Sequence, residues 1–323
     1  MPDHRGHDQP LASGDTVIVV GGTGLIGPPL ARALAAIGLD VVVVSRNPAA
    51  EGVLPGSARH ICTDRSELPT LIETWDKIPV LGVVDVIAEQ PGEVSPLLEA
   101  AAPFPGRTVI IGSAAVLGPR PRGVLHAEDV EPAPASGDMR AKLAIERLAQ
   151  DHHRAGRATV DLRCSYPYGP GHGPMTPLGR DVGLFSKLAR HDPITWVEED
   201  DLAPIQPLWA PDLAAAIAAL ITRPAKPAAL YHVAGPEIVS WDEYLRLLAA
   251  GAWPQERLRR VPVTTLIDRH PEAWWLRDHL RTAPLLDDSR MRREVFACTT
   301  RLTDAVGRWA SWCRSFDHAA PRC

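Results

Sequence analysis

A strand-like run followed at once by a glycine-rich turn is the feature that most constrains the fold of this 323-residue chain. Residues 16–20 are Thr-Val-Ile-Val-Val, a β-branched segment typical of a strand buried on both faces of a parallel sheet. The turn Gly21-Gly-Thr-Gly-Leu-Ile-Gly27 follows directly, and apolar residues over 30–37 then recur at the spacing of a helix face. A second β-branched run over 41–44 completes a βαβ unit.

The glycine turn predicts a dinucleotide site. Glycines between a strand and a helix let the backbone approach a pyrophosphate, and the helix N-terminus offers N–H groups and positive dipole charge to it. The alternative is a tight turn that binds no ligand. The turn residues expected to bind the cofactor are Gly21, Thr23, Gly24, Leu25, Ile26 and Gly27.

The residues after the second strand indicate which dinucleotide is bound. An acidic side chain there would accept the ribose 2′-hydroxyl of NAD, whereas an arginine would pair with the 2′-phosphate of NADP. The chain has Ser45-Arg46-Asn47, so NADP is the expected cofactor and NAD stays possible. The alternative for Arg46 is a solvated loop residue. Asp64, after the next expected strand, is placed either to accept from the adenine amino group or to cap a loop.

Alternation of strands and helices continues to about residue 165. Buried parallel strands are expected over 80–88, 108–111 and 158–163, with a helix over 139–150. This pattern predicts a doubly wound parallel sheet, the Rossmann form of the α/β class. We expect a disordered lead-in over 1–13, a dinucleotide-binding domain over 14–168, and a smaller mixed α/β lobe over 169–323 that is interleaved with it.

Composition argues against several other classes of protein. The 39 acidic and 34 basic groups give a net charge of −5, which disfavours nucleic-acid partners. The five cysteines are scattered and have no CxxC spacing, so neither a disulfide framework nor a metal site is indicated. The N-terminus has no apolar signal core, and no later run reaches the roughly 18 apolar residues of a membrane span. We therefore expect a cytoplasmic protein without a membrane partner.

Six segments together resemble the extended short-chain dehydrogenase/reductase superfamily, of the NAD(P)-dependent epimerase/dehydratase type, over about residues 15–316. The resemblance implies that Asp64 contacts the adenine, that Ser113 polarises a substrate oxygen, and that Lys142 holds the nicotinamide ribose. It also implies that the second lobe binds a small-molecule substrate, and dimerisation is common in the family. The matching segments are 21–27, Asp64, Ile111-Gly-Ser-Ala-Ala-Val-Leu-Gly118, Lys142, 162–171 and Pro207-Leu-Trp-Ala-Pro-Asp-Leu-Ala214.

One position departs from the family pattern. The catalytic tyrosine of the family stands four residues before the lysine, where this chain has Asp138, and no tyrosine precedes Tyr166. A tyrosine beside a lysine is still protonated at neutral pH and can donate a proton, whereas an aspartate of reference pKa about 3.9 is ionised. Three roles are open for Asp138. It is a residue of the helix N-terminus that pairs with Lys142 and has no part in the chemistry, or it is a general base. In the third, it binds a polar substrate while Tyr168, Tyr166 or a water supplies the proton.

The loop over 170–180 is expected to face the substrate, with His172 and Arg180 as candidate ligands. Three functions remain open at this stage. The first is an NADP-binding oxidoreductase or epimerase-like enzyme that acts on a hydroxyl- or carbonyl-bearing molecule with an altered proton relay. The second is a redox-neutral lyase, isomerase or cyclase that uses Asp138 as its base. The third is a non-catalytic dinucleotide sensor.

Overall fold

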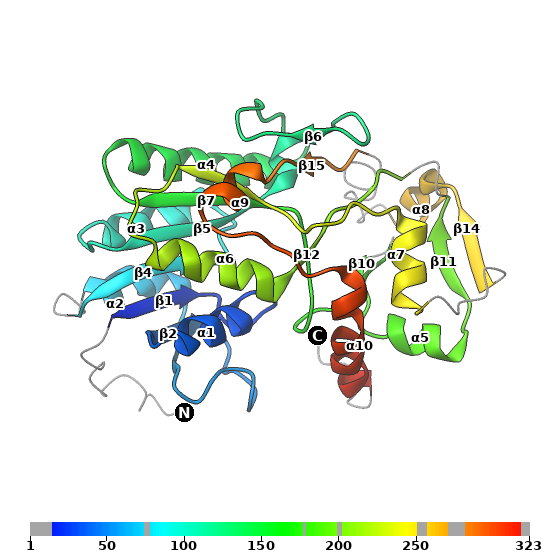
Figure 1. Cartoon of the computed structure of the whole chain (residues 1–323), viewed down its shortest axis with the longest axis horizontal. Helices are drawn as coiled ribbons and strands as arrows, with labels where there is room; N and C mark the ends of the chain where they lie inside the picture. Colours follow the sequence, from blue (N-terminus) through cyan, green and yellow to red (C-terminus); the bar gives the residue numbers. More distant parts are fainter. Residues whose placement is uncertain are drawn as a thin grey trace.

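A parallel sheet of seven strands forms the centre of the larger lobe (Figure 1). The computed structural model describes residues 15–73, 78–176, 179–198, 202–250, 257–270 and 282–317, so the lead-in expected over 1–13 lies outside the described residues. The order across the sheet is β13-β7-β5-β4-β1-β2-β3, and all neighbouring strands are parallel. The predicted doubly wound α/β fold is therefore confirmed. Its strands are β1 (Thr16–Val20), β2 (Asp40–Ser45), β3 (Arg59–Cys62), β4 (Val80–Asp85), β5 (Arg107–Ser113), β7 (Thr159–Cys164) and β13 (Leu230–Val233).

Helices cover both faces of the sheet because its strands are apolar on both sides. Along β1, Val17 and Val19 pack toward one layer of helices, and Ile18 and Val20 pack toward the other. The first layer holds α1 (Gly27–Ala36) and α6 (Ala210–Thr222). The second holds α2 (Leu68–Glu73), α3 (Pro91–Ala101) and α4 (Gly137–Arg154).

The direction of chain progression reverses at β1. The chain runs outward through β2 and β3 and then returns to place β4 on the opposite side of β1. In open α/β sheets, ligands bind beyond the carboxyl ends of the strands at such a reversal. The predicted glycine turn follows β1 at this point, so the sheet order indicates a ligand site at that edge.

The second lobe has an aromatic core. Trp196, Trp241 and Trp309 are fully buried there, and Ser240 caps α7 by accepting a hydrogen bond of 3.1 Å from the Glu243 N–H. The lobe contains β9 (Met175–Thr176), β10 (Gly179–Arg180), α5 (Leu184–Arg190), β11 (Ile194–Val197), α7 (Trp241–Leu248), β14 (Leu258–Val261), α8 (Val263–Arg269) and α10 (Leu302–Asp317).

Sequence order and spatial order are interleaved between the lobes. β13 and α6 come from the second half of the chain but belong to the sheet and its helical cover (Figure 1). No helix in the described part of the chain is both long enough and apolar enough to cross a membrane. The remaining short elements are β6 (Leu125–His126), β8 (Tyr166–Tyr168), β12 (Pro207–Trp209), β15 (Leu285–Leu286) and α9 (Ser289–Glu294).

A buried ion pair joins α4 to the sheet. The Arg163 guanidinium on β7 donates two hydrogen bonds of 2.7 Å to the Glu146 carboxylate, and the two side chains are 2% and 4% exposed. Arg163 Nη1 also lies 3.3 Å from His232 Nε2 on β13. Because both charges are desolvated, neither can be removed without leaving the other uncompensated.

We predict that Arg163→Met destabilises the fold by about 3–5 kcal/mol, since it leaves the Glu146 carboxylate buried without a countercharge. Urea denaturation followed by circular dichroism measures this as a fall in the midpoint. Arg154→Met is the matched control, because Arg154 pairs with Asp151 on the surface and its loss costs about 1 kcal/mol or less. Equal small effects of the two variants would contradict the prediction.

Candidate active site

The glycine turn brings the first helix directly against the end of the first strand. A Cβ on Gly27 would lie 2.2 Å from the Gly22 Cα, so Gly27 must lack a side chain for α1 to start there. A Cβ on Gly22 would instead lie 2.4 Å from the Val43 Cγ1 on β2. Gly21 has a φ of +80° and donates its N–H to the Val44 carbonyl at 2.8 Å. By contrast, a Cβ on Gly24 would meet no protein atom within 4 Å. The turn therefore has an open side at Gly24, where a ligand can approach the backbone.

Backbone N–H groups at this open side precede the helix hydrogen-bond ladder. The first intrahelical bond runs from the Leu30 N–H to the Ile26 carbonyl at 3.1 Å. Pro28 and Pro29 occupy the first turn and have no N–H, so Leu25, Ile26 and Gly27 supply the donors. This is the arrangement that binds a pyrophosphate at a helix N-terminus.

The residues expected to bind the adenosine end converge in one cavity of about 200 Å³. Ser45 ends β2, Arg46 follows it, Asp64 follows β3, and all three line this cavity. The Ser45 hydroxyl donates to the Asn47 carbonyl at 2.8 Å, which fixes the loop that carries the exposed Arg46. The structure thus brings together the residues that the sequence singled out for NADP selection.

Asp64 caps the short turn that follows it. Its Oδ1 accepts hydrogen bonds from the Ser66 N–H at 3.0 Å and from the Ser66 hydroxyl at 2.8 Å. These bonds, together with the nearby positive charge of Arg46, hold the pKa of Asp64 below its ordinary value. The capping alternative is thus observed, and Oδ2 makes none of these bonds.

Sequence reasoning missed an ion pair in the same cavity. The Arg65 guanidinium donates to the fully buried Asp85 carboxylate at the end of β4, with one contact of 2.9 Å and a second, shorter one. Asp85 also accepts from the Ile87 N–H at 3.1 Å, and the Ile87 side chain lies where a Cβ on Gly21 would stand. The sequence did contain a signal for this ion pair, because Asp85 is an acidic residue near the middle of the otherwise apolar run 80–88.

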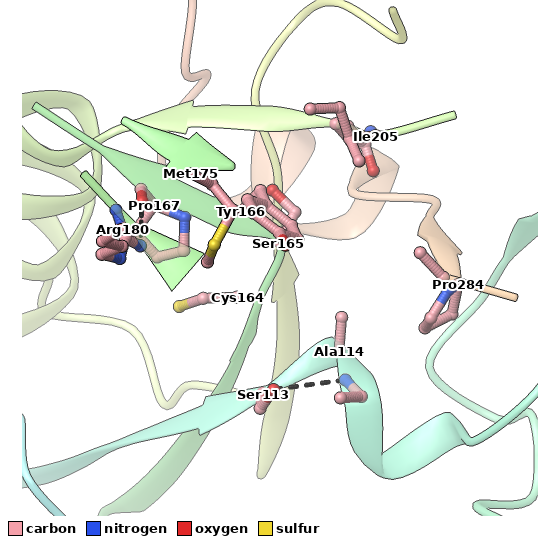
Figure 2. A pocket seen from close by; sticks show the side chains of 13 residues that line it. Ser113, Ala114, Cys164, Ser165, Tyr166, Pro167, Met175, Arg180, Ile205 and Pro284 are labelled. Atoms are coloured by element: carbon pink, nitrogen blue, oxygen red, sulfur yellow. Dashed lines mark hydrogen bonds between the residues drawn. The ribbon is translucent and has the colours of Figure 1, made fainter. Parts of the chain in front are cut away.

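Ser113 lies at the carboxyl end of β5 and lines a second cavity, of about 270 Å³ (Figure 2). Its Oγ accepts a hydrogen bond of 3.2 Å from the Ala115 N–H. Because the oxygen is an acceptor in that bond, the hydroxyl hydrogen is left to donate to another oxygen. Ser113 is paired in register with Cys164 at the end of β7, so the cavity continues the row of strand ends that the first cavity begins.

Lys142 contacts the segment that follows β4, and Asp138 lines neither cavity. The Lys142 Nζ donates to the Ala88 carbonyl beyond β4, and burial is the largest cause that lowers the Lys142 pKa. Asp138 is exposed in the first turn of α4, where Ser136 is the N-cap. The four-residue spacing puts Asp138 and Lys142 on one helix face, but the ion pair considered above is not formed.

Tyr168 is not brought to the cavity. Its ring lies 5.2 Å from that of Trp209 and 5.0 Å from that of Trp309, and among the described residues its buried hydroxyl has no hydrogen-bond partner. Burial raises the pKa of Tyr168 far above its ordinary value. Of the proton sources considered above, Tyr168 is therefore the one that packs as a core aromatic, because tryptophans from distant segments cover it. Tyr166, two residues earlier, lines the cavity instead (Figure 2).

The two candidate substrate ligands are also separated. Arg180 lines the cavity, whereas His172 is exposed outside it and its carbonyl accepts a hydrogen bond of 2.8 Å from Trp309 Nε1. The neighbouring Gly171, with a φ of +114°, passes so close to the glycine turn that a Cβ there would lie 2.9 Å from the Leu25 Cα. The loop thus joins the two lobes at the dinucleotide end.

Solved structures share this architecture over nearly the whole chain. The dTDP-glucose 4,6-dehydratase of Bacillus anthracis str. Ames, in complex with NAD, is 14% identical, with a TM-score of 0.77 and coverage of 94% of this chain and 98% of that one. The UDP-glucose 4-epimerase of Thermus thermophilus, also with NAD, is 19% identical, with a TM-score of 0.73 and coverage of 93% and 99%.

A third neighbour, the UDP-glucuronic acid 4-epimerase of Bacillus cereus in complex with UDP-glucuronic acid and NAD, is 18% identical, with a TM-score of 0.72 and coverage of 93% and 99%. At these identities the likeness shows the fold. No curated protein has a significant sequence match to this chain. The sequence profile of the NAD dependent epimerase/dehydratase family, however, matches residues 17–234. The chain therefore belongs to the NAD dependent epimerase/dehydratase family, of the extended short-chain dehydrogenase/reductase type.

Proposed function

We propose that this chain is an NADP-binding enzyme that moves a hydride between the dinucleotide and a small molecule bearing a hydroxyl or carbonyl group. The observation that carries the proposal is the position of the Ser113 hydroxyl in a cavity that continues the row of strand ends from the glycine turn. The solved relatives bind or act on nucleotide sugars, so this substrate class is the first to screen.

The residues around the glycine turn fit a nicotinamide dinucleotide. The open side at Gly24 and the helix-end N–H groups suit the pyrophosphate, and the Arg46 guanidinium suits a 2′-phosphate. The three neighbouring structures described above are complexes with NAD, so the preference for NADP rests on Arg46 and on the absence of a carboxylate from residues 45–47. When bound, the dinucleotide supplies or accepts a hydride.

Two side chains have separate tasks in this proposal. The Ser113 hydroxyl donates a hydrogen bond to the substrate oxygen, which stabilises negative charge that develops there. Lys142, already directed at the Ala88 carbonyl, holds the nicotinamide ribose and adds a positive charge near the reacting centre.

Tyr166 is the residue that best fits the proton donor. Burial raises the pKa of Tyr166 to about 12, so the phenol is protonated at neutral pH and able to donate. Its ring packs edge-on against Trp241 at 6.1 Å, which fixes its orientation at the cavity wall. The redox-neutral alternative requires Asp138 as its base. Asp138 is exposed and does not line the cavity, so its position favours the hydride-transfer function.

We predict that Gly24→Ala weakens NADP⁺ binding at least tenfold, about 1.4 kcal/mol, at an unchanged melting temperature. The added methyl would project into the space reserved for the pyrophosphate and meets no protein atom within 4 Å. Isothermal titration measures the affinity. Gly307→Ala is the matched control, because its Cβ also meets open space but lies on α10, outside the lining of the adenosine cavity. Unchanged affinity in Gly24→Ala would exclude the turn as the dinucleotide site.

We predict that Arg46→Ala weakens NADP⁺ and NADPH by about 10- to 100-fold and leaves NAD⁺ and NADH nearly unchanged. The variant removes a charged hydrogen bond of about 1.5–3 kcal/mol to the 2′-phosphate. Titration with all four dinucleotides measures the difference. Arg308→Ala, a charge removal at an exposed position of α10, serves as the control. Equal weakening of the phosphorylated and unphosphorylated forms would separate Arg46 from the 2′-phosphate.

We predict that Tyr166→Phe lowers NADPH-dependent carbonyl reduction by about 100-fold or more, as expected for loss of a general acid. Loss of NADPH absorbance with a panel of aldehydes and keto-sugars measures the rate. Asp138→Asn is expected to leave that rate within a few-fold of the parent. If Asp138→Asn abolishes product formation while NADPH is not consumed, the redox-neutral function with Asp138 as base replaces this proposal.

A further inference from the structure

The cavity at Ser113 carries a single formal charge. Of the thirteen described residues that line it, only Arg180 is ionised at neutral pH, and the others are small, apolar or neutral polar residues (Figure 2). Arg180 lies on β10, in a short antiparallel hairpin that pairs it with Met175 on β9. Its position on a hairpin fixes where the charge stands on the cavity wall.

The contacts of Arg180 hold it in place without neutralising it. Nη1 donates to the Gly173 carbonyl at 3.3 Å and Nη2 donates to the Pro167 carbonyl at 2.9 Å. A guanidinium has five N–H donors, and these two bonds use two of them, so three remain. Carbonyls are dipoles and carry no net charge, so the cation keeps its full charge.

The adjacent acid is already paired elsewhere. Asp181 follows Arg180 directly, but its Oδ2 accepts from the Lys187 ammonium at 2.7 Å and its Oδ1 accepts from the Gly183 N–H at 2.9 Å. No carboxylate within the described part of the chain forms an ion pair with Arg180. Burial lowers the pKa of Arg180, which is the direction expected for a desolvated cation, although an arginine stays protonated.

Arg180 is partly buried. A desolvated cation without a protein countercharge is costly, and the cost is offset when a ligand supplies the negative charge. We propose that Arg180 binds a carboxylate of the substrate, so that the enzyme acts on a carboxylic acid whose hydroxyl or carbonyl group lies at Ser113. The proposal rests on the function proposed above and specifies its substrate class. It makes Arg180 the residue that determines substrate charge.

A carboxylate fits this site better than a phosphoryl group. A carboxylate carries one negative charge and two acceptor oxygens, which match one guanidinium and a bidentate pair of N–H donors. A phosphate monoester carries about 1.5 to 2 negative charges near neutral pH, and the cavity lining offers no second cation for it. Phosphate binding is therefore an outcome that the experiment must be able to detect.

The test is a titration of the NADP⁺-saturated protein with matched ligands. The carboxylates are benzoate, mandelate and hexanoate, the neutral partners are their amides, and phenyl phosphate is the phosphoryl probe. We expect at least one carboxylate to bind with millimolar Kd or tighter, and its amide at least tenfold more weakly. Three results would overturn the proposal. They are no binding of any of the three carboxylates, equal affinity for an acid and its amide, and tighter binding of phenyl phosphate than of benzoate.

Variants assign the binding to the guanidinium. Arg180→Gln is expected to lose carboxylate binding at least tenfold while NADP⁺ affinity is unchanged, and Arg180→Lys, which keeps the charge without the fork, is expected to fall between. Arg190→Gln, at an exposed arginine paired with Asp192, is the matched control. If Arg180→Gln does not fold, Arg180→Lys tests the proposal instead. Unchanged carboxylate affinity in Arg180→Lys would exclude a bidentate pair between the guanidinium and the carboxylate. Unchanged carboxylate binding in Arg180→Gln would contradict the proposal. Arg180 would then only stabilise the loop over 167–173 through its hydrogen bonds to the Pro167 and Gly173 carbonyls.

Failure of this proposal is distinguishable from failure of the proposed function. NADP⁺ affinity is measured first on each sample, and its absence in the parent protein contradicts the dinucleotide function. The carboxylate titration is then repeated without dinucleotide, so that the role of Arg180 is decided in either case.

Discussion

The contact between Gly22 and Gly27 is the constraint on which the site depends. Because Gly27 has no side chain, α1 begins directly at the end of β1, and the amides of its first turn lie beside the open space at Gly24. The parallel sheet then aligns the other strand ends along the same edge, and this edge carries Arg46, Asp64 and Ser113. A bulkier residue at Gly27 would displace the helix from the strand, and one at Gly22 would press on Val43 of β2.

The buried and partly buried arginines differ in whether a carboxylate of the protein pairs with them. Arg163 pairs with Glu146 and Arg65 pairs with Asp85, so in both cases a buried carboxylate of the protein supplies the countercharge. Arg180 contacts two backbone carbonyls, while the acid beside it in sequence pairs with Lys187. The first two arrangements stabilise the fold. The third leaves a charge on the wall of the Ser113 cavity without a carboxylate partner among the described residues, and the carboxylate proposal rests on its place beside Ser113.

In the proposed function, the dinucleotide half of the family's site is kept and the proton relay is altered. The glycine turn, Ser113 and Lys142 stand where the family pattern puts them, and Asp138 occupies the tyrosine position at an exposed site on α4. A phenol has nevertheless been placed at the cavity by a different element, β8, which carries Tyr166. The proposed function therefore assigns proton donation to a side chain on β8 and not to one on α4.

The sequence by itself determined the βαβ unit, the doubly wound class and the common position of the residues proposed to bind the adenosine, because these depend on local periodicity and on the shared edge of parallel strands. Only the tertiary structure decided between Tyr166 and Tyr168, which lie on one strand. Trp209 and Trp309, from distant segments, cover Tyr168 and leave Tyr166 at the cavity. The tertiary structure likewise paired Arg65 with Asp85 and gave Arg180 no carboxylate partner among the described residues, because countercharges are set by distance in space, which one sequence does not give.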